Sequence, residues 1–297
     1  MRRHLNTLFV TTDGSYLMQD VETVAVRHEK TTKLRVPLHN LDGIITFGWD
    51  IGCSPQLMAA CADRTITLSF CDPYGRLLAT AHRYASDDPA ASLAIARPCI
   101  AAKLANSRLN LQRALRDHPP TDPDDHRNLS TAISHLAHRA QATFGATDLD
   151  ILRGIEGDGA DTYFRCFNHL LTIDEPTFRF TQRSRRPPLD IPNALLSFLY
   201  SLLTHDVRSA CEASGLDAAV GFLHRDRPGR PSLALDLMEE LRPVLADRLA
   251  LTLLNRQQLK PNDFDHEPTG GVRLRDDARK TVLMAWQERK SDELTHP

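Results

Sequence analysis

Paired cysteines and glycine-rich nucleotide loops are missing from this sequence. Its six cysteines form no CxxC pair and no zinc-ribbon spacing, which argues against a structural zinc site and favours reduced, mostly buried thiols. There is no GxGxxG, no Walker A motif and no GxSxG, so nucleotide-driven chemistry and a serine nucleophile elbow have no support. Any chemistry must therefore be sought in other patterns.

Long apolar runs and an excess of positive charge are missing as well. The longest apolar-rich run, from Asn193 to Leu203, is interrupted by two serines and is too short to span a bilayer. No apolar segment follows the basic residues at the start, so we expect no signal peptide, no membrane contact and a cytoplasmic protein. The net charge is -2, so a nucleic-acid surface would have to be a local patch.

The patterns that are present change character near position 85. Ser54 and Pro55 supply an N-cap and a first-turn proline for one helix that continues to Asp63. Strand-like segments, bounded by turn signals, cover 7–10, 23–26, 33–36, 43–47 and 65–70. Helical spacing of apolar residues follows over 91–116, 128–142, 148–171, 191–213 and 234–253.

These patterns predict an α+β protein with two domains. A small β-rich domain covers residues 1–85, and a larger all-helical domain covers residues 86–297. The polar segment from Arg83 to Ala90 is the expected linker, because the hydrophobic period switches there. Past about Trp286 the chain is almost entirely polar, and we expect it to fray.

The glycine-rich segment from Gly154 to Ala160 is the first candidate for a functional site. Glycine inside a helix costs roughly 1 kcal/mol relative to alanine, and this segment holds several. Such a cost is tolerated where another helix or a phosphate chain approaches the backbone closely. Glu156 lies between Gly154 and Gly157, so its carboxylate is open to a ligand. Taken alone, the segment fits a loop with a solvated glutamate even better.

A histidine followed by an acidic helix forms the second candidate. His224 ends an apolar segment, and Ser232 can cap the helix that comes next. Asp236 and Glu239 are three residues apart, hence on one face, where both can point at one cation. With His224 they would form a site that suits Mn²⁺ and tolerates Mg²⁺. The alternative is an ordinary helix with a charged outer face.

Arginines collect in two stretches, one with interleaved aromatics and no carboxylate and one beside His224. Guanidinium groups bind phosphates bidentately, and aromatic rings such as Phe178 and Phe180 can stack on unpaired bases. A solvated loop is the alternative. The arginines expected to form a phosphate-binding surface are Arg183, Arg185, Arg186, Arg225, Arg227 and Arg230.

Together the motifs resemble the CRISPR-associated Cas-one family of DNA integrases. The glycine and glutamate segment, followed by Tyr163 and Phe164, looks like the central glutamate motif of that family. The 185–188 loop with the following helix resembles its arginine-proline motif, and 221–224 with 232–243 resembles its histidine and acidic-helix motifs. The three occur in the family's order, and the resemblance covers the whole chain.

The resemblance implies a metal-dependent DNA endonuclease and integrase of CRISPR adaptation and antiviral defence. A 3′-hydroxyl of spacer DNA would attack a phosphodiester of the CRISPR array. Glu156, His224 and Glu239 align with catalytic residues that bind Mg²⁺ or Mn²⁺, and Asp236 aligns with an acidic residue that supports or joins the metal site. Lys103 and Asn106 fit a polar pair common in the family, to which no role is assigned.

The resemblance also implies partners and leaves alternatives open. The partners would be prespacer and repeat DNA, a second copy of the chain joined through the N-terminal domain, and a dimer of the small Cas-two protein. A repair nuclease that cuts branched DNA without joining it is one alternative. A non-enzymatic DNA-binding scaffold, whose acidic cluster is structural, is the other.

Overall fold

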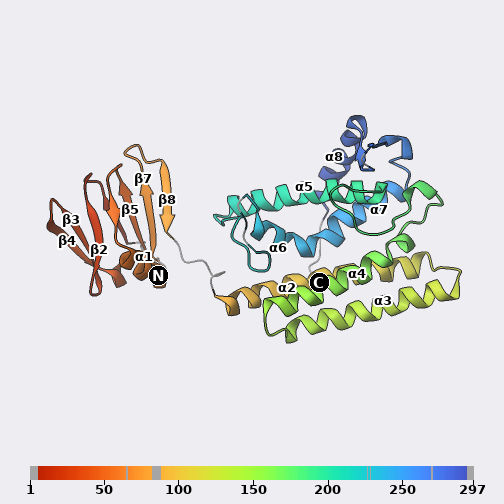
Figure 1. Cartoon of the computed structure of the whole chain (residues 1–297), viewed down its shortest axis with the longest axis horizontal. Helices are drawn as coiled ribbons and strands as arrows, with labels where there is room; N and C mark the ends of the chain where they lie inside the picture. The colour runs from red at the N-terminus through yellow and green to blue at the C-terminus, as the bar shows by residue number, and fades with distance from the viewer. Residues whose placement is uncertain are drawn as a thin grey trace. The chain divides into compact units, whose positions relative to one another are not determined.

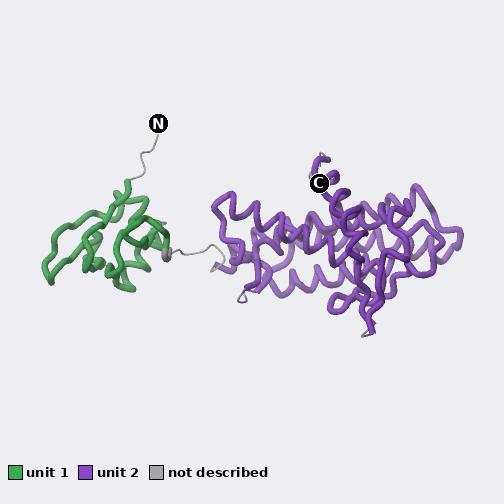
Figure 2. Tube along the Cα trace, turned by 90° about the horizontal axis from the view of Figure 1, so that it is seen from above, with its two compact units in different colours: residues 1–87 green, residues 88–297 purple. Residues whose placement is uncertain are grey.

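The computed structural model describes residues 6–292, apart from positions 65, 82–87, 226, 228 and 269. The chain divides into two compact units, residues 1–87 and residues 88–297 (Figure 2). Most of the expected linker from Arg83 to Ala90 lies outside the described residues. The fold class predicted from the sequence is confirmed, since a strand-rich region precedes a helical one.

The N-terminal unit contains two four-stranded sheets. In the first, β1, β5 and β7 run parallel, with Thr7 paired to Gly43 and Gly43 to Thr67, and β8 is antiparallel to β7. The order of this sheet is β1 (Thr7–Val10), β5 (Gly43–Phe47), β7 (Thr67–Cys71) and β8 (Leu77–Ala81). The order of the second is β4 (Thr31–Pro37), β3 (Thr23–His28), β2 (Tyr16–Asp20) and β6 (Gly52–Cys53).

One helix packs with these sheets around a small core. Ser54 caps α1 (Pro55–Asp63) as predicted, because its hydroxyl accepts a hydrogen bond from the Leu57 amide at 3.2 Å. Leu17, Ile44 and Leu57 are fully buried in this core. The strands β2, β6 and β8 were not predicted, and pairing with β3, β2 and β7 respectively is what stabilises them.

The C-terminal unit is a helical bundle. In Figure 1, α2, α3 and α4 lie alongside one another, α6 packs over α2, and α5 packs against α6 and α7. Ile100 and Leu111 on α2 are fully buried, so this long helix passes through the core. The helices are α2 (Pro89–Asp117), α3 (Pro123–Ala142), α4 (Leu149–Arg165), α5 (Ile191–Ala213), α6 (Ser232–Leu241), α7 (Arg248–Asn255) and α8 (Asp276–Lys290).

Shorter elements join these helices. The hairpin of β9 and β10 adds two strands to a domain predicted as all-helical. The 3-10 turns are η1 (Leu38–Asn40), η3 (Thr143–Gly145), η4 (Phe167–Leu170), η5 (Pro176–Phe178) and η7 (Pro261–Asp263), and the hairpin strands are β9 (Phe264–His266) and β10 (Val272–Leu274). No helix among the described residues is both long enough and apolar enough to cross a membrane.

The single helix predicted from 234 to 253 is interrupted. A π-helical segment, η6 (Arg242–Asp247), separates α6 from α7. Pro243 lies in this segment and has no N–H to donate, which favours a departure from regular α-helical bonding. The interruption matters for the site, because it places Arg242 and Asp247 directly after the acidic helix.

The expectation of fraying past Trp286 was wrong for the next turn of helix. Trp286 is buried, and its indole N–H donates to the Asp206 carboxylate at 2.8 Å. Lys290 pairs with the same carboxylate at 2.9 Å. These contacts with α5 hold α8 helical as far as Lys290. A polar sequence with one anchoring tryptophan therefore folds through tertiary contacts.

Candidate active site

Helix α4 carries Glu156 and the three glycines around it. The segment is a continuous helix, so the interpretation as a loop between helices was wrong. Asp148 begins the helix by accepting a hydrogen bond from the Ile151 amide at 2.8 Å. A side chain at Gly159 would overlap Leu104 of α2, whereas one at Gly154 or Gly157 would meet nothing.

The glycines thus have two different uses. Gly159 lets α4 approach α2 closely, which brings Glu156 toward α2. Gly154 and Gly157 leave the helix surface beside Glu156 bare and exposed to solvent. The backbone next to this carboxylate is consequently accessible to a ligand.

Asp236 of α6 organises the loop that ends at His224. Its carboxylate accepts hydrogen bonds from the backbone amides of Phe222, Leu223 and His224 at 2.6, 2.9 and 2.9 Å. A side chain at Gly221 would come within 2.9 Å of this carboxylate, so only glycine allows the loop to lie so close to α6. Asp236 is only 3% exposed, and the expectation of a charged outer face was wrong.

The same aspartate orients the imidazole of His224. The Asp236 Oδ1 atom lies 2.5 Å from His224 Nδ1. A carboxylate on one ring nitrogen fixes the ring and leaves the other nitrogen for a ligand. His224 Nε2 is 3.9 Å from Glu239 Oε1 and faces the same pocket. With its amide and imidazole contacts, Asp236 has little accepting capacity left.

Glu239 is buried among positive charges. It is 3% exposed, with Arg242 Nη1 at 2.9 Å and Lys103 Nζ at 2.6 Å from its oxygens. Burial opposes ionisation, but the positive charges of Arg242, Lys103 and His224 outweigh it and lower the pKa of Glu239 to about 2. Glu239 is therefore an anion throughout the physiological pH range.

The ammonium group of Lys103 joins the two glutamates. It forms ion pairs with both Glu156 and Glu239, which come from different helices. The Glu239 Oε2 atom is buried and lies within ion-pair distance of Lys103, yet it has no hydrogen bond of proper geometry. Asn106, one turn further along α2, donates to the Glu240 backbone carbonyl at 2.9 Å and fastens α6 to α2.

A pocket of about 400 Å³ opens onto these groups. Among the described residues, no three histidine, cysteine, aspartate or glutamate side chains are gathered closely enough to hold a metal ion as they stand. Two carboxylates and an imidazole nevertheless face one pocket, and a cationic ammonium already lies between the carboxylates. This donor set fits a hard divalent cation. The pocket is lined by Arg153, Glu156, Leu223, His224, Arg225, Arg227, Arg230 and Glu239.

The predicted arginines separate into three groups. Arg225, Arg227 and Arg230 line the pocket, as the sequence interpretation expected of arginines beside His224. Arg185 and Arg186 are exposed on the loop before α5, and they are not among the residues that line it.

Arg183 has a different environment from the other predicted arginines. It donates to the Asn193 side chain at 2.7 Å, and its guanidinium stacks over the Tyr200 ring at 5.3 Å. Partial burial lowers the pKa of Arg183, and its guanidinium group contacts other side chains of the fold. Phe178 and Phe180 are each 2% exposed, which makes their expected role in stacking on bases wrong.

Two residues of the site were missed from the sequence. Arg153 donates to the Leu223 carbonyl at 3.0 and 2.7 Å, which ties α4 to the histidine loop. Arg242 pairs with Glu239 and stacks over Tyr200 at 5.0 Å. Each arginine lies three residues from a candidate glutamate, on the same helical face, and this spacing was the available signal.

A buried acid lies behind these charges. Tyr200 donates to Asp247 Oδ1 at 2.7 Å. Burial raises the pKa of Asp247 to about 6, although the tyrosine hydroxyls and the charges of Arg242 and Arg183 oppose that rise. The chain from Glu239 through Arg242 and Tyr200 to Asp247 fixes the inner wall of the pocket.

A strand-rich unit is followed by a helical unit, and one pocket of the helical unit combines carboxylates, an imidazole and arginines, the kinds of group that phosphodiester-processing enzymes use. Comparison of the sequence identifies the family. Residues 8–288 match the family described as CRISPR associated protein Cas1. The chain belongs to the Cas1 family, as its motifs indicated.

Individual relatives support this assignment. The chain is 47% identical to "CRISPR-associated endonuclease Cas1 1" of Chlorobaculum tepidum, over 100% of this chain and 90% of that protein. It is 50% identical to "CRISPR-associated endonuclease Cas1 2" of Rhodospirillum rubrum, again over 100% and 90%. The relatives are thus named as endonucleases over the full length of this chain.

Solved structures show the same fold. A CAS1 protein from Thermotoga maritima has a TM-score of 0.58 at 23% identity, covering 96% of this chain and 90% of its own. A casposase bound to an integration product has a TM-score of 0.59 at 22% identity, with 98% and 84% covered. A partial Cas6-RT-Cas1–Cas2 complex gives a TM-score of 0.60 at 23% identity, with 96% and 88% covered.

Proposed function

We propose that this chain is a metal-dependent DNA integrase that inserts spacer DNA into a CRISPR array. The observation that carries the proposal is the meeting of Glu156 and Glu239 around one cationic group, with His224 Nε2 and three arginines facing the same pocket. Relatives named as Cas1 endonucleases and a structural neighbour bound to an integration product support the class of chemistry.

The proposed metal ligands are Glu156, His224 and Glu239. A bound Mg²⁺ or Mn²⁺ would polarise the attacked phosphate and stabilise charge on the attacking or leaving oxygen. Asp236 serves as a positioning residue, because its hydrogen bonds to the loop and to His224 Nδ1 occupy its oxygens. This choice makes Glu239, rather than Asp236, the third ligand.

Lys103 and Arg242 take supporting roles in this proposal. The Lys103 ammonium holds the two glutamates together and keeps Glu239 ionised before the metal enters. Arg242 stays paired with Glu239 Oε1 and orients the carboxylate from the opposite side. Both side chains are almost fully buried, so water is kept from the inner end of the pocket.

The surrounding arginines would hold DNA. Arg225, Arg227 and Arg230 line the pocket mouth and can bind backbone phosphates without reading sequence. Arg185 and Arg186 can extend this surface, since both are exposed, whereas Arg183 is left out because it is partly buried and bonded to Asn193. The bare helix surface at Gly154 and Gly157 leaves room for a strand beside Glu156.

The partners are proposed on the same basis. A Cas1–Cas2 complex is among the solved structures of like fold, so we propose assembly with a Cas2 dimer. Prespacer and repeat DNA are the proposed substrates. The N-terminal unit is the proposed contact between two copies of this chain.

Strand joining by purified protein tests the proposal. The full chain, its Cas2 partner, Mn²⁺ or Mg²⁺, a short duplex with 3′-hydroxyl ends and a supercoiled CRISPR plasmid are incubated together. Glu156→Gln is expected to reduce the joined product by roughly 10²–10³-fold, because it removes one oxygen ligand and a negative charge. Asp161→Asn, on the same helix but paired with Arg165 at the surface, is the matched control.

The products separate the alternatives. Joined plasmid that disappears with EDTA and in Glu156→Gln supports the integrase. Cut DNA with no joined product would mean a nuclease that does not integrate. DNA binding without any metal-dependent product would mean a scaffold with a structural acidic cluster. Normal joining by Glu156→Gln would contradict the proposed metal site.

A further inference from the structure

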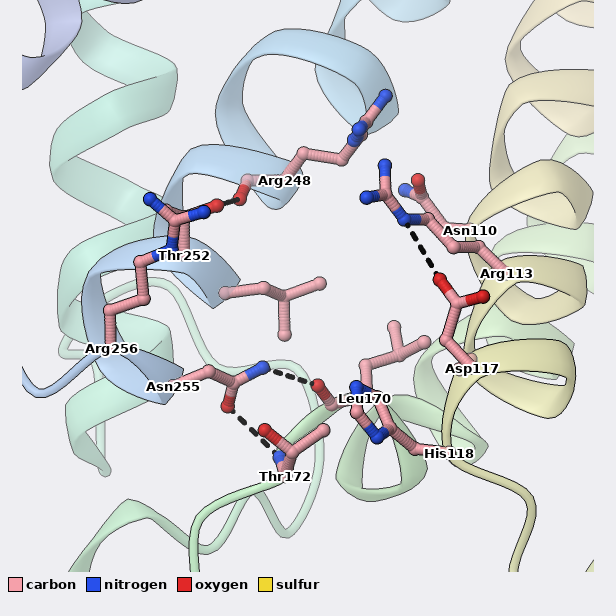
Figure 3. Close-up of a pocket in the computed structure, with 12 residues that line it drawn as sticks. Asn110, Arg113, Asp117, His118, Leu170, Thr172, Arg248, Thr252, Asn255 and Arg256 are labelled. Atoms are coloured by element: carbon pink, nitrogen blue, oxygen red, sulfur yellow. Dashed lines mark hydrogen bonds and ion pairs between the residues drawn. The ribbon is translucent and has the colours of Figure 1, made fainter.

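A second pocket lies further along α2 than Lys103. The C-terminal end of α2, the segment after η4, and α7 enclose a cavity of about 340 Å³ (Figure 3). Arg113, one of its lining residues, is ten residues beyond Lys103, which is about 15 Å along the helix. The pocket is therefore separate from the candidate active site, and no residue lines both.

The walls of this pocket are fixed by hydrogen bonds of two asparagine side chains. Asn255 Nδ2 donates to the Leu170 carbonyl at 2.9 Å, and Asn255 Oδ1 accepts from the Thr172 amide at 2.9 Å (Figure 3). Asn110 is buried and donates to the Pro243 carbonyl at 3.0 Å. These bonds join α2, η6, α7 and the 170–172 segment into a built cavity.

The charge around the cavity is unbalanced. Arg113, Arg248 and Arg256 line it, against one carboxylate, that of Asp117. Asp117 is already shared, with Arg113 Nε at 3.3 Å and Arg116 Nε at 2.8 Å. In the part of the chain that the structure describes, no carboxylate pairs with Arg248 or Arg256. Three guanidinium groups less one carboxylate leave a surplus of two positive charges.

The positive charge of Arg248 lies in an environment that disfavours it. Its side chain extends toward that of Arg113, which comes from the facing helix (Figure 3). Burial, together with the charges of Arg113 and Arg289, lowers the pKa of Arg248. Like charges gathered in a partly buried cavity repel one another unless an anion joins them.

We propose that this second pocket binds a phosphate group, carried either by a DNA backbone or by a free phosphate-bearing molecule. Guanidinium forks bind phosphate oxygens bidentately, and the surplus of two charges matches a phosphate dianion or two neighbouring phosphodiesters. The size of the cavity lies within the range of about 300–1,000 Å³ common for ligand pockets. Binding to DNA rests on the proposed function, whereas binding of free phosphate does not.

Salt dependence of DNA binding tests the DNA source. Fluorescence anisotropy of a labelled short duplex is measured with the full chain in EDTA, at salt concentrations of roughly 50–200 mM. Arg248→Gln/Arg256→Gln is expected to lower the slope of log K against log salt by roughly 0.9 for each phosphate that the variant no longer neutralises. The matched control is Arg127→Gln/Arg208→Gln, which removes two exposed arginines that are paired with acids elsewhere.

Thermal unfolding with inorganic phosphate tests the other source. Phosphate should raise the Tm of the wild-type chain and of the control more than that of Arg248→Gln/Arg256→Gln. Arg248→Lys/Arg256→Lys keeps the charge and should retain part of the salt slope and part of the phosphate-induced Tm shift. This variant therefore separates loss of charge from loss of folding.

The outcomes are distinct. A reduced salt slope supports the DNA source, and disappearance of the phosphate-induced Tm shift with an unchanged slope supports a small phosphate ligand. Wild-type behaviour of the glutamine variant in both measurements would overturn the proposal. Because EDTA removes any metal chemistry, failure of the proposed integrase reaction would leave these measurements unaffected.

Discussion

The two pockets of the helical unit present opposite electrostatic arrangements around the same long helix. At the first, Glu156 and Glu239 face each other and are joined by the Lys103 ammonium. At the second, Arg113, Arg248 and Arg256 surround a cavity whose single carboxylate is already shared. The first pocket carries its own counter-ion and the second does not.

The difference shows that one fold can present carboxylates at one pocket and arginines at another, each suited to a ligand of opposite charge. Buried carboxylates are costly unless a cation accompanies them, so the first pocket holds an internal lysine, which the metal of the proposed function would replace or join. Arginines in a half-open pocket are partly screened by water, so their mutual repulsion costs less than an unpaired buried carboxylate would. Removing a charge should therefore have opposite effects at the two pockets.

The largest effect is expected from Lys103→Met. Loss of the ammonium leaves Glu239 buried with only Arg242 as a close cation and separates it from Glu156, which should lower the free energy of unfolding by about 3–5 kcal/mol. Urea unfolding in EDTA measures this loss. Mn²⁺ should restore more stability to Lys103→Met than it adds to the wild type, and Lys103→Arg is the charge-conserving control. Equal stability of the wild type and Lys103→Met in EDTA would contradict the contrast drawn between the two pockets.

An intermediate effect is expected from Asp247→Asn, at the residue where η6 leads into α7. The pKa of Asp247 is raised from 3.8 to about 6, so the folded chain binds its proton more tightly than the unfolded chain. This contribution to stability is complete below pH 3.8 and is lost as the pH rises through about 6, by up to about 3 kcal/mol.

Asparagine cannot ionise and can still accept the Tyr200 hydroxyl. The variant should therefore lack this loss of stability between pH 4 and 6, a window set by the two pKa values. Urea unfolding of both proteins at several pH values gives the difference. Parallel curves for wild type and variant would show that Asp247 does not titrate in this window.

The smallest effect is expected from Arg256→Gln in the second pocket. Because Arg256 has no carboxylate partner among the described residues and lines the pocket together with Arg113 and Arg248, its loss should leave stability unchanged or raise it by a few tenths, about 0.2–0.5 kcal/mol. Urea unfolding at low salt measures the change, and added phosphate should remove any gain. Clear destabilisation would mean that Arg256 has a structural role, and the contrast with Lys103 would fail.

Much of the fold could be predicted from local sequence. The cap formed by Ser54 and Pro55, the strand from Gly43 to Phe47 and the helix from Ile191 to Ala213 depend on neighbouring residues, and the structure has them as predicted. The strands β2, β6 and β8 were missed, because β2 and β8 are stabilised as hairpins with β3 and β7 and the two-residue β6 by pairing with the distant β2. The interruption at Pro243 lies inside an otherwise helical period, which hid it.

For the candidate site too, local sequence could predict some features and not others. Spacing alone placed Asp236 and Glu239 on one helical face and marked Glu156 by its glycines, and the order of motifs indicated the family. The sequence by itself thus determined the family and the two kinds of domain, and it supplied the residues that are proposed to bind a metal.

Only the tertiary structure decided how those residues are used. It showed that Asp236 is occupied by the 222–224 amides and that Lys103 lies between the two glutamates. It also showed that Arg183 stacks over Tyr200 inside the fold and that a second, arginine-lined pocket exists. The physical reason is that charge, burial and hydrogen bonding depend on contacts between segments far apart in the chain, which local periodicity cannot specify.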